Sequence, residues 1–175
     1  MIYGGGSSYH GIYLHNTTNV IIKGTTCFNN RYNFLVDNST NIHITQCNST
    51  SPNLDGIFLN RSRDLYVDYT YAYTAPFHNF RANNVQNLTL YCCTINGQGV
   101  SWKGVRLNSC NDTVIRETKV YNCTNRGVDL HSSCNITINS SAVVSSARVG
   151  ICVNPVSYTH LRAHETEADL VCRLL

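Results

Sequence analysis

Basic and histidine side chains recur at regular distances in the middle of this chain, where they could bind an anion or accept a proton. Two sets of three residues have spacings of 25 and then 23 positions: His78, Lys103 and Arg126, and Arg81, Arg106 and Asp129. Arginine and lysine form strong hydrogen bonds with carboxylates, and either of them, or histidine, can remove a proton from a bound substrate. The equal spacings predict that these side chains lie together on one face of a repeating structure.

Aromatic and apolar side chains occupy the same repeat positions earlier in the chain, at Tyr13, Tyr32, Leu35 and Phe58. Aromatic rings pack against sugar rings, and arginine and lysine pair with uronate carboxylates. We therefore expect an acidic polysaccharide as the partner. The expected binding residues are Tyr13, Tyr32, Phe58, His78, Arg81, Arg106, Arg126 and Asp129. The alternative is an ordinary solvent-facing sheet surface with its aromatic rings packed under loops.

The repeat that aligns these residues is about 23 positions long. Its units begin at Gly11, Asn33, Gly56, Asn79, Gly104, Gly127 and Gly150. Counted from the first residue of a unit, apolar or small residues recur at positions 1 and 3, 9 and 11, and 14 and 16. Val105, Leu107 and Ile115 illustrate the pattern. Alternation with a period of two is typical of a strand with one buried side, so each unit predicts three short strands.

One such unit cannot bury its own apolar side, so the units must stack, with strands about 4.8 Å apart, into a three-faced solenoid. The pattern resembles right-handed β-helices such as pectate lyases and polygalacturonases, over residues 11–154. The expected fold class is therefore an all-β, right-handed, single-stranded parallel β-helix of six to seven coils, with three short strands per coil. Because many activities share this fold, the resemblance does not select one of them.

A polar column stands at position 8 of the units and consists of Asn19, Asn41, Asp64, Asn87, Asp112 and Asn135. Stacked amides at one corner can form a hydrogen-bonded ladder that satisfies backbone groups. We therefore expect Asn87 and Asn135 to be inaccessible, although both begin N-x-S/T sequons.

The resemblance to polygalacturonases can be tested on their catalytic motifs. Asn53 and Asp55 match the N-x-D motif, but the expected second aspartate is replaced by Phe77-His78, and the later histidine is absent. Inverting hydrolysis needs two carboxylates, so an active polygalacturonase is disfavoured. A lyase remains open and needs a base, and whether the chain is an enzyme is uncertain. The catalytic candidates are Lys103, Arg106, Arg126, His131 and Asp55.

Cofactors and cross-links have little support in the sequence. A calcium site needs several carboxylates, and only Asp37 and Asp55 could approach one another, so no metal or other cofactor is expected. Of the nine cysteines, several fall in inward columns, where a thiol acts as a small apolar group. Cys110 and Cys134 lie at nearly equal positions of neighbouring coils and could form a disulfide.

Composition narrows the partners and the location. The net charge of +3 is too small to indicate nucleic acid, and no apolar run is long enough to span a membrane. The first residues lack the features of a signal peptide. Nine sequons, at Asn16, Asn38, Asn48, Asn60, Asn87, Asn111, Asn122, Asn135 and Asn139, fit an extracellular or cell-surface location. A non-catalytic structural or adhesive repeat is the alternative function.

Three segments are expected. Residues 1–10 form a partial N-terminal coil or a disordered leader, and residues 11–154 form the β-helix. The last part, residues 155–175, resembles the translation of a sequencing adapter, because an adapter reading frame encodes Val156–Leu175 almost completely. We therefore expect this tail to be non-native, and the natural sequence to be truncated near Asn154.

Overall fold

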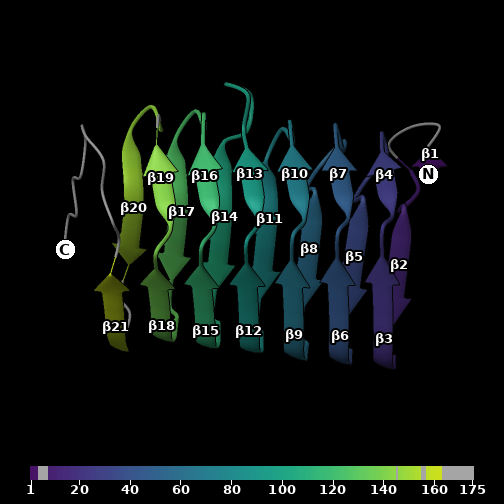
Figure 1. Cartoon of the computed structure of the whole chain (residues 1–175), viewed down its shortest axis with the longest axis horizontal. Coiled ribbons are helices and arrows are strands. Elements are labelled where there is room, and N and C mark those ends of the chain that lie inside the picture. The colour runs from purple at the N-terminus through teal and green to yellow at the C-terminus, as the bar shows by residue number, and fades with distance from the viewer. Residues whose placement is uncertain (4–7, 145, 155–156, 163–175) are drawn as a thin grey trace.

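The repeat folds into three parallel sheets that face one another around a common core, as the sequence predicts. This computed structural model describes residues 1–3, 8–144 and 146–154, and the backbone of 157–162. The sheets wind as a right-handed β-helix, and Figure 1 shows the strands of each sheet side by side along the long axis. Every pairing between neighbouring coils is parallel and aligns equivalent repeat positions, for example Leu107 with Leu130.

Sheet 1 contains the first strand of each coil. Its strands are β2 (Ile12–His15), β5 (Phe34–Asp37), β8 (Ile57–Asn60), β11 (His78–Asn83), β14 (Lys103–Asn108), β17 (Arg126–His131) and β20 (Val149–Asn154). Sheet 2 contains the second strands. They are β3 (Thr18–Lys23), β6 (Thr40–Thr45), β9 (Arg63–Asp68), β12 (Gln86–Tyr91), β15 (Asn111–Arg116), β18 (Cys134–Asn139) and β21 (Ser157–Arg162).

Sheet 3 contains the third strands, which have two or three residues each. They are β1 (Ile2–Tyr3), β4 (Thr26–Phe28), β7 (Asn48–Thr50), β10 (Tyr71–Tyr73), β13 (Thr94–Asn96), β16 (Lys119–Tyr121) and β19 (Ala142–Val144). At the two ends of the stack, β1 pairs with β4 and the backbone of β21 pairs with β18. The adapter origin of residues 155–175 stays a prediction, and 163–175 lie outside the described residues.

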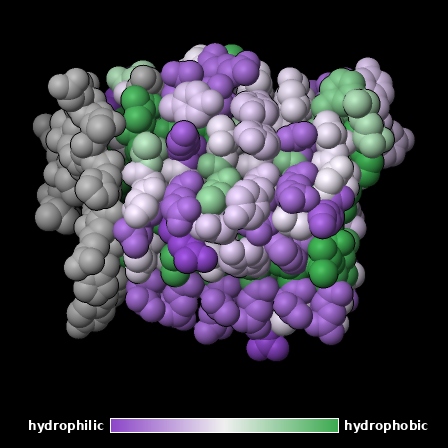
Figure 2. Space-filling model, in the orientation of Figure 1, coloured by the Kyte–Doolittle hydropathy of each residue, from purple (hydrophilic) through white to green (hydrophobic). Residues whose placement is uncertain are grey.

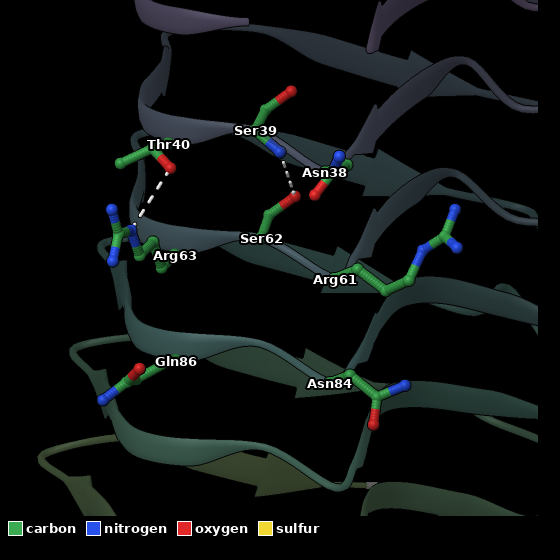
Figure 3. A pocket seen from close by; sticks show the side chains of 8 residues that line it. All are labelled: Asn38, Ser39, Thr40, Arg61, Ser62, Arg63, Asn84 and Gln86. Carbon is green, nitrogen blue, oxygen red and sulfur yellow. Dashed lines mark hydrogen bonds between the residues drawn. The ribbon is translucent and has the colours of Figure 1, made fainter. Parts of the chain in front are cut away.

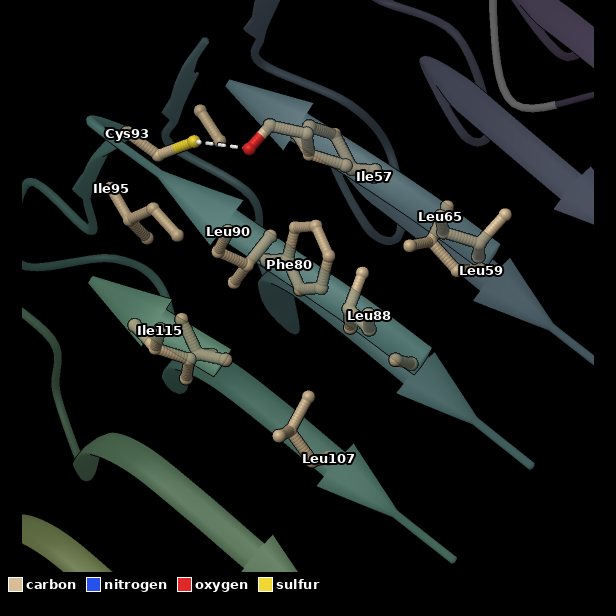
Figure 4. Close-up of a cluster of buried hydrophobic side chains, with 14 of the residues drawn as sticks. Ile57, Leu59, Leu65, Phe80, Leu88, Leu90, Cys93, Ile95, Leu107 and Ile115 are labelled. Carbon is tan, nitrogen blue, oxygen red and sulfur yellow. Dashed lines mark hydrogen bonds between the residues drawn. The ribbon is translucent and has the colours of Figure 1, made fainter. Parts of the chain in front are cut away.

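The core lies between the three sheets and is filled by the inward columns. Figure 4 shows part of it, where Phe80, Leu90 and Ile115 from sheets 1 and 2 pack together. Their side chains are at most 1% exposed. Burying an aliphatic or aromatic side chain contributes roughly 1.5–3 kcal/mol, largely offset by chain entropy, so the core depends on the whole stack.

The third strand differs from the prediction in one detail. It has one inward residue rather than two, because the residues at position 14, such as Cys47 and Thr118, lie at the corner before it. There the side chain accepts a hydrogen bond from the coil before it: the N–H of Thr118 donates to Ser141 Oγ at 3.2 Å, and that of Cys93 to Thr118 Oγ1 at 3.3 Å. Small hydroxyls thus satisfy buried corner N–H groups.

The expected asparagine ladder exists, but its role and its burial were predicted wrongly. Asn41 Nδ2 donates to Asn19 Oδ1, and Asn87 Nδ2 to Asp64 Oδ1, each at 2.7 Å. These side chains are exposed, as is Asn135, so they satisfy no buried group. All six residues of the column instead have φ between 52° and 59°, in the left-handed region that asparagine and aspartate tolerate best. The column is therefore selected by backbone conformation.

Coil length varies at one corner only. From the first residue of a coil to the end of its third strand, the distance is 17 positions in each of the first six coils, for example from Gly104 to Tyr121. The segment from the third strand to the next coil is residues 29–32 in the first coil but residues 97–103 in the fourth. Insertions therefore lie beside the start of sheet 1.

The disulfide that the sequence allows between Cys110 and Cys134 is absent. All eight cysteines of the described residues are free, including Cys110 and Cys134. Cys110 points into the core, where its Sγ donates to the Ala82 carbonyl, whereas the Cys134 thiol donates to Asn111 Oδ1 on the outside. The difference of one position places the two thiols on opposite faces of the backbone. The described part of the chain contains no helix that could cross a membrane.

Candidate functional site

The outer side of sheet 1 carries a cluster of charged side chains that is largely buried. Asp55, His78, Lys103 and Asp129 are each 1–4% exposed, although their columns face away from the core. The alternative of an ordinary solvent-facing surface therefore does not hold for these four residues. A charge taken out of water must be paired, so the contacts of each determine what the cluster can do.

Close packing at the entry to sheet 1 fixes the backbone of these residues. The first residue of each coil is glycine or a buried asparagine, because the backbone of the next coil lies against it. A Cβ on Gly56 would stand 2.5 Å from the Asn79 carbonyl oxygen, and one on Gly104 2.6 Å from that of Gly127. Asn79 Oδ1 accepts the N–H of Ala75 at 3.0 Å and so holds the same turn.

Asp55 and His78 form the first half of the cluster. Asp55 Oδ1 lies 2.7 Å from His78 Nδ1 and accepts the backbone N–H of His78 at 3.1 Å. Arg81 NH1 approaches Asp55 Oδ2 at 3.2 Å. In the neutral form of the ring, this short contact places the proton on Nδ1 and the lone pair on Nε2. His78 Nε2 is buried and has no hydrogen-bond partner among the residues that the structure describes.

Asp129 is the centre of the second half. Lys103 Nζ donates to its Oδ2 at 2.6 Å, Arg126 NH1 donates to its Oδ1 at 2.5 Å, and Arg106 Nε lies 4.0 Å away. Three cations therefore surround one carboxylate, which leaves a formal surplus of two positive charges. The Arg106 and Arg126 side chains are each 30% exposed, so this surplus can reach a ligand.

The two groups at the centre have pKa values moved from their ordinary ranges. Burial alone would raise the pKa of Asp129, but its hydrogen bonds and charge contacts with Lys103 and Arg126 lower it overall. Burial lowers the pKa of Lys103, and its bond to Asp129 opposes that change. Asp129 is therefore ionised at neutral pH and cannot donate the proton that a general acid must supply.

Aromatic rings border the charged cluster and connect it with the earlier coils. His10 stacks on Tyr32 at 5.2 Å between ring centroids, and Tyr32 lies 5.4 Å from Phe58. The Arg81 guanidinium stands 3.7 Å from the centre of the Phe58 ring, a cation–π contact. The aromatic and basic strips that the sequence predicts as two patches thus form one continuous path along sheet 1.

The remaining predicted residues lie at the margin of this path. Tyr13 is 51% exposed and its ring is 5.5 Å from that of His10. His131 is exposed at the far end of β17, in line with Asn108 rather than with the charged cluster. The structure therefore brings together Lys103, Arg106, Arg126 and Asp129, and it leaves His131 apart.

Asp37 belongs to a separate group at the other end of the first strands. It contacts His15 Nδ1 at 3.0 Å, Arg61 NH2 at 2.8 Å and Asn60 Nδ2 at 2.7 Å. Although burial acts in the opposite direction, these hydrogen bonds lower the pKa of Asp37. Asp37 and Asp55 thus have different partners. Within the described residues, no three His, Cys, Asp or Glu side chains gather in an arrangement that could hold a metal ion.

A shallow polar pocket of about 490 Å³ lies at the corner between sheets 1 and 2. It is lined by Asn38, Ser39, Thr40, Arg61, Ser62, Arg63, Asn84 and Gln86. Figure 3 shows that Arg61 and Arg63 point away from each other, so they do not converge on one ligand. In the view of Figure 2 the surface is mostly polar, with hydrophilic side chains along its lower edge. The charged cluster on sheet 1 remains the stronger candidate.

Trp102 is the residue of the site that the sequence reasoning missed. Its indole centroid lies 4.6 Å from Lys103 Nζ and 6.3 Å from the His78 ring. Two signals could have found it. Trp102 is the only tryptophan of the chain, and it lies in the longest connection, immediately before Lys103.

Comparisons with known proteins agree with this architecture. The family model described as "Right handed beta helix region" matches residues 10–162. The periplasmic alginate epimerase AlgG is 18% identical with a TM-score of 0.73, and the match covers 87% of this chain and 40% of AlgG. The A-module of the mannuronan C-5 epimerase AlgE6 from Azotobacter vinelandii is 15% identical with a TM-score of 0.72, over 83% and 41%.

A third similar structure is the enzymatically active domain of tailspike protein 2 from bacteriophage CBA120. It is 13% identical with a TM-score of 0.70, over 93% of this chain and 30% of the tailspike chain. The chain thus spans less than half the length of each of these three proteins. At these identities the likeness shows a shared fold. No curated protein matches the sequence significantly.

Proposed function

The chain belongs to the right-handed β-helix family, and from its charged face we propose that it binds an acidic polysaccharide along the outer side of sheet 1. The observation that carries the proposal is the surplus of positive charge around Asp129. The side chains of Arg106 and Arg126 remain 30% exposed although both lie near that carboxylate. Guanidinium groups bind carboxylates in a planar, bidentate manner that suits a uronate.

The shape of the face supports a long ligand. The path from Tyr32 through Phe58 and Arg81 to Arg106 crosses four successive strands, β5 to β14 and the turns before them. Strands in a sheet are about 4.8 Å apart, so the path is long enough for several sugar residues. Two of the similar solved structures are epimerases of alginate and of mannuronan, which supports a polysaccharide as the ligand here. An extracellular or periplasmic location is part of this proposal.

Affinity electrophoresis in gels that contain polygalacturonate, alginate or a neutral glucan tests the proposal. We expect the acidic polymers to retard the chain and the neutral glucan to leave its mobility unchanged. Substitution of Arg81, Arg106 and Arg126 by alanine should abolish the retardation. The matched control replaces Lys23, Arg63 and Lys119, three exposed cations of sheets 2 and 3, by alanine and so changes the net charge equally. Equal loss in both variants, or no retardation at all, would refute specific binding.

A lyase-like reaction is the second candidate, and the contact between Asp55 and His78 favours it. In the neutral imidazole, the contact with Asp55 keeps the proton on Nδ1, so Nε2 has the lone pair that a base needs. In β-elimination, Nε2, once a bound substrate displaces the side chains that cover it, would take the C5 proton of a uronate. A C4–C5 double bond then forms, and the C4–O bond breaks. The departing oxygen receives a proton from water. Arg106 would stabilise the charge that develops on the carboxylate.

The ultraviolet absorbance of the unsaturated uronate product tests this second candidate. We expect the absorbance to rise when the chain is incubated with a bound polyuronate. His78→Gln should abolish the rise but weaken binding far less than the substitution of Arg81, Arg106 and Arg126. Binding without any unsaturated product would leave a non-catalytic polysaccharide-binding repeat. Neither binding nor product would favour a structural or adhesive role for the solenoid.

A further inference from the structure

Trp102 is exposed in an unusual setting for a large aromatic residue. Its side chain is 45% exposed, yet the segment that carries it is firmly held. Ser101 is completely buried, and its carbonyl accepts the N–H of Thr124 at 2.8 Å. The Trp102 carbonyl accepts the N–H groups of Asn125 at 3.1 Å and Arg126 at 3.3 Å. The indole is thus presented on an anchored backbone.

The indole of Trp102 lies beside the positively charged part of the site. One face lies near the ammonium of Lys103, whose other contact is Asp129. The backbone bond to Arg126 places the arginine of the next coil beside the tryptophan. A ring that is half exposed next to a surplus of positive charge offers the two features by which a uronate differs from other anions. A uronate has an apolar C–H face and a carboxylate at its edge.

We propose that Trp102 is the wall of a single uronate subsite, in which one sugar ring stacks on the indole and its carboxylate binds Arg126 and Arg106. The inference rests on the proposed function and adds the residue that would distinguish a sugar acid from any other polyanion. The connection of seven residues, two longer than in the neighbouring coils, supplies this wall. An anchored ring loses little freedom on binding, which favours affinity.

Because Trp102 is the only tryptophan, its fluorescence reports on this subsite directly. The probes are oligogalacturonate and oligomannuronate of defined length, with a glucose oligomer of equal length and a linear polyphosphate as controls. We expect the two uronates to change the emission with the same dissociation constant that calorimetry measures. The glucose oligomer and the polyphosphate should not shift the emission in this way.

Two substitutions separate stacking from folding. Trp102→Ala should weaken uronate binding roughly tenfold, and Trp102→Phe should restore most of the loss, because an aromatic ring suffices. Tyr71→Ala is the matched control, since Tyr71 is 44% exposed but lies in sheet 3, and it should bind as the unmodified chain does. Thermal unfolding of each variant checks that the fold is intact.

The possible outcomes distinguish the two proposals. If calorimetry finds no binding of any uronate, the proposed function fails, and the subsite fails with it. If uronates bind but the emission is unchanged and Trp102→Ala binds normally, the subsite alone is refuted. If Trp102→Ala does not fold, the emission change of the unmodified chain decides, and a polyphosphate that produces the same change counts against stacking.

Discussion

The ammonium of Lys103 lies 2.6 Å from the carboxylate of Asp129, and both side chains are almost completely buried on the outer side of sheet 1. Outward columns of a β-helix usually meet water, so this pair is protected by its neighbours rather than by the core. A buried pair costs desolvation energy and contributes little net stability, but breaking it leaves one charge without a partner. The pair therefore identifies the part of the surface where the chain keeps buried charges in spite of their desolvation energy.

Removing the carboxylate should destabilise the fold. In Asp129→Asn, Lys103 and Arg126 lose their counter-charge, and we expect the free energy of unfolding to fall by roughly 3–5 kcal/mol. Urea denaturation followed by circular dichroism measures the change. Asp64→Asn is the matched control, because Asp64 is exposed at a left-handed corner that asparagine also tolerates, and it should shift stability by less than about 0.5 kcal/mol. Equal effects would mean that the buried pair is not distinctive.

Stability should decrease in acid because of Asp37 and Asp129. Both have pKa values below the ordinary value of 3.8 in the folded chain. The unfolded chain therefore takes up these protons at higher pH than the folded chain does, so their contribution is present above about pH 4 and is lost as the pH falls through the folded values. Urea midpoints measured from neutral pH down into this range should show a decline that is smaller in Asp37→Asn. An identical decline in that variant would contradict the assignment.

The left-handed corners predict a contrast between two substitutions of one residue. Asn41 has a φ of 55° and donates to Asn19. Asn41→Gly removes the amide but permits this conformation, so it should change stability by a few tenths of a kcal/mol. Asn41→Val should cost about 1–2 kcal/mol, because a β-branched residue is strained there. If both variants lose the same stability in urea denaturation, the amide bond rather than the backbone conformation is what matters.

The cysteines should differ strongly in reactivity. Burial raises the pKa of Cys93 to about 12 and that of Cys110 to about 11, so few thiolates form at neutral pH. Under native conditions, alkylation followed by peptide mass spectrometry should label the outward-facing Cys134 early and Cys93 and Cys110 late. Full labelling should follow in denaturant without a reductant. A mass consistent with a Cys110–Cys134 bridge would contradict the structure.

Most of the fold was predictable because a solenoid repeats its constraints. Alternating columns such as Val105, Val128 and Ile151 are visible in the sequence, and each is buried as expected. The errors concern residues whose role depends on the path of the backbone between strands. The asparagine at position 8 pointed correctly to a corner, but only φ angles reveal that the residue is selected for left-handed geometry and not for a buried ladder.

The candidate site was predictable in its columns but not in its burial. The regular spacing of His78, Lys103 and Arg126 placed them side by side correctly, as the pairings between β11, β14 and β17 show. Lys103 and Asp129 are buried by neighbouring residues and connections. The connections do not follow the repeat, so the sequence pattern does not predict this burial. Trp102 was missed for the same reason, because it lies in the longest connection, which departs from the period.

The single corner at which coil length varies has a consequence for how such a chain can change over time. Since the stretch from the start of each coil to its third strand is constant, residues can be gained or lost between sheets 3 and 1 without shifting any paired strand. Each new loop at that corner emerges next to the outer side of sheet 1. Under the proposed function, ligand preference can thus diversify one coil at a time while the scaffold is inherited unchanged.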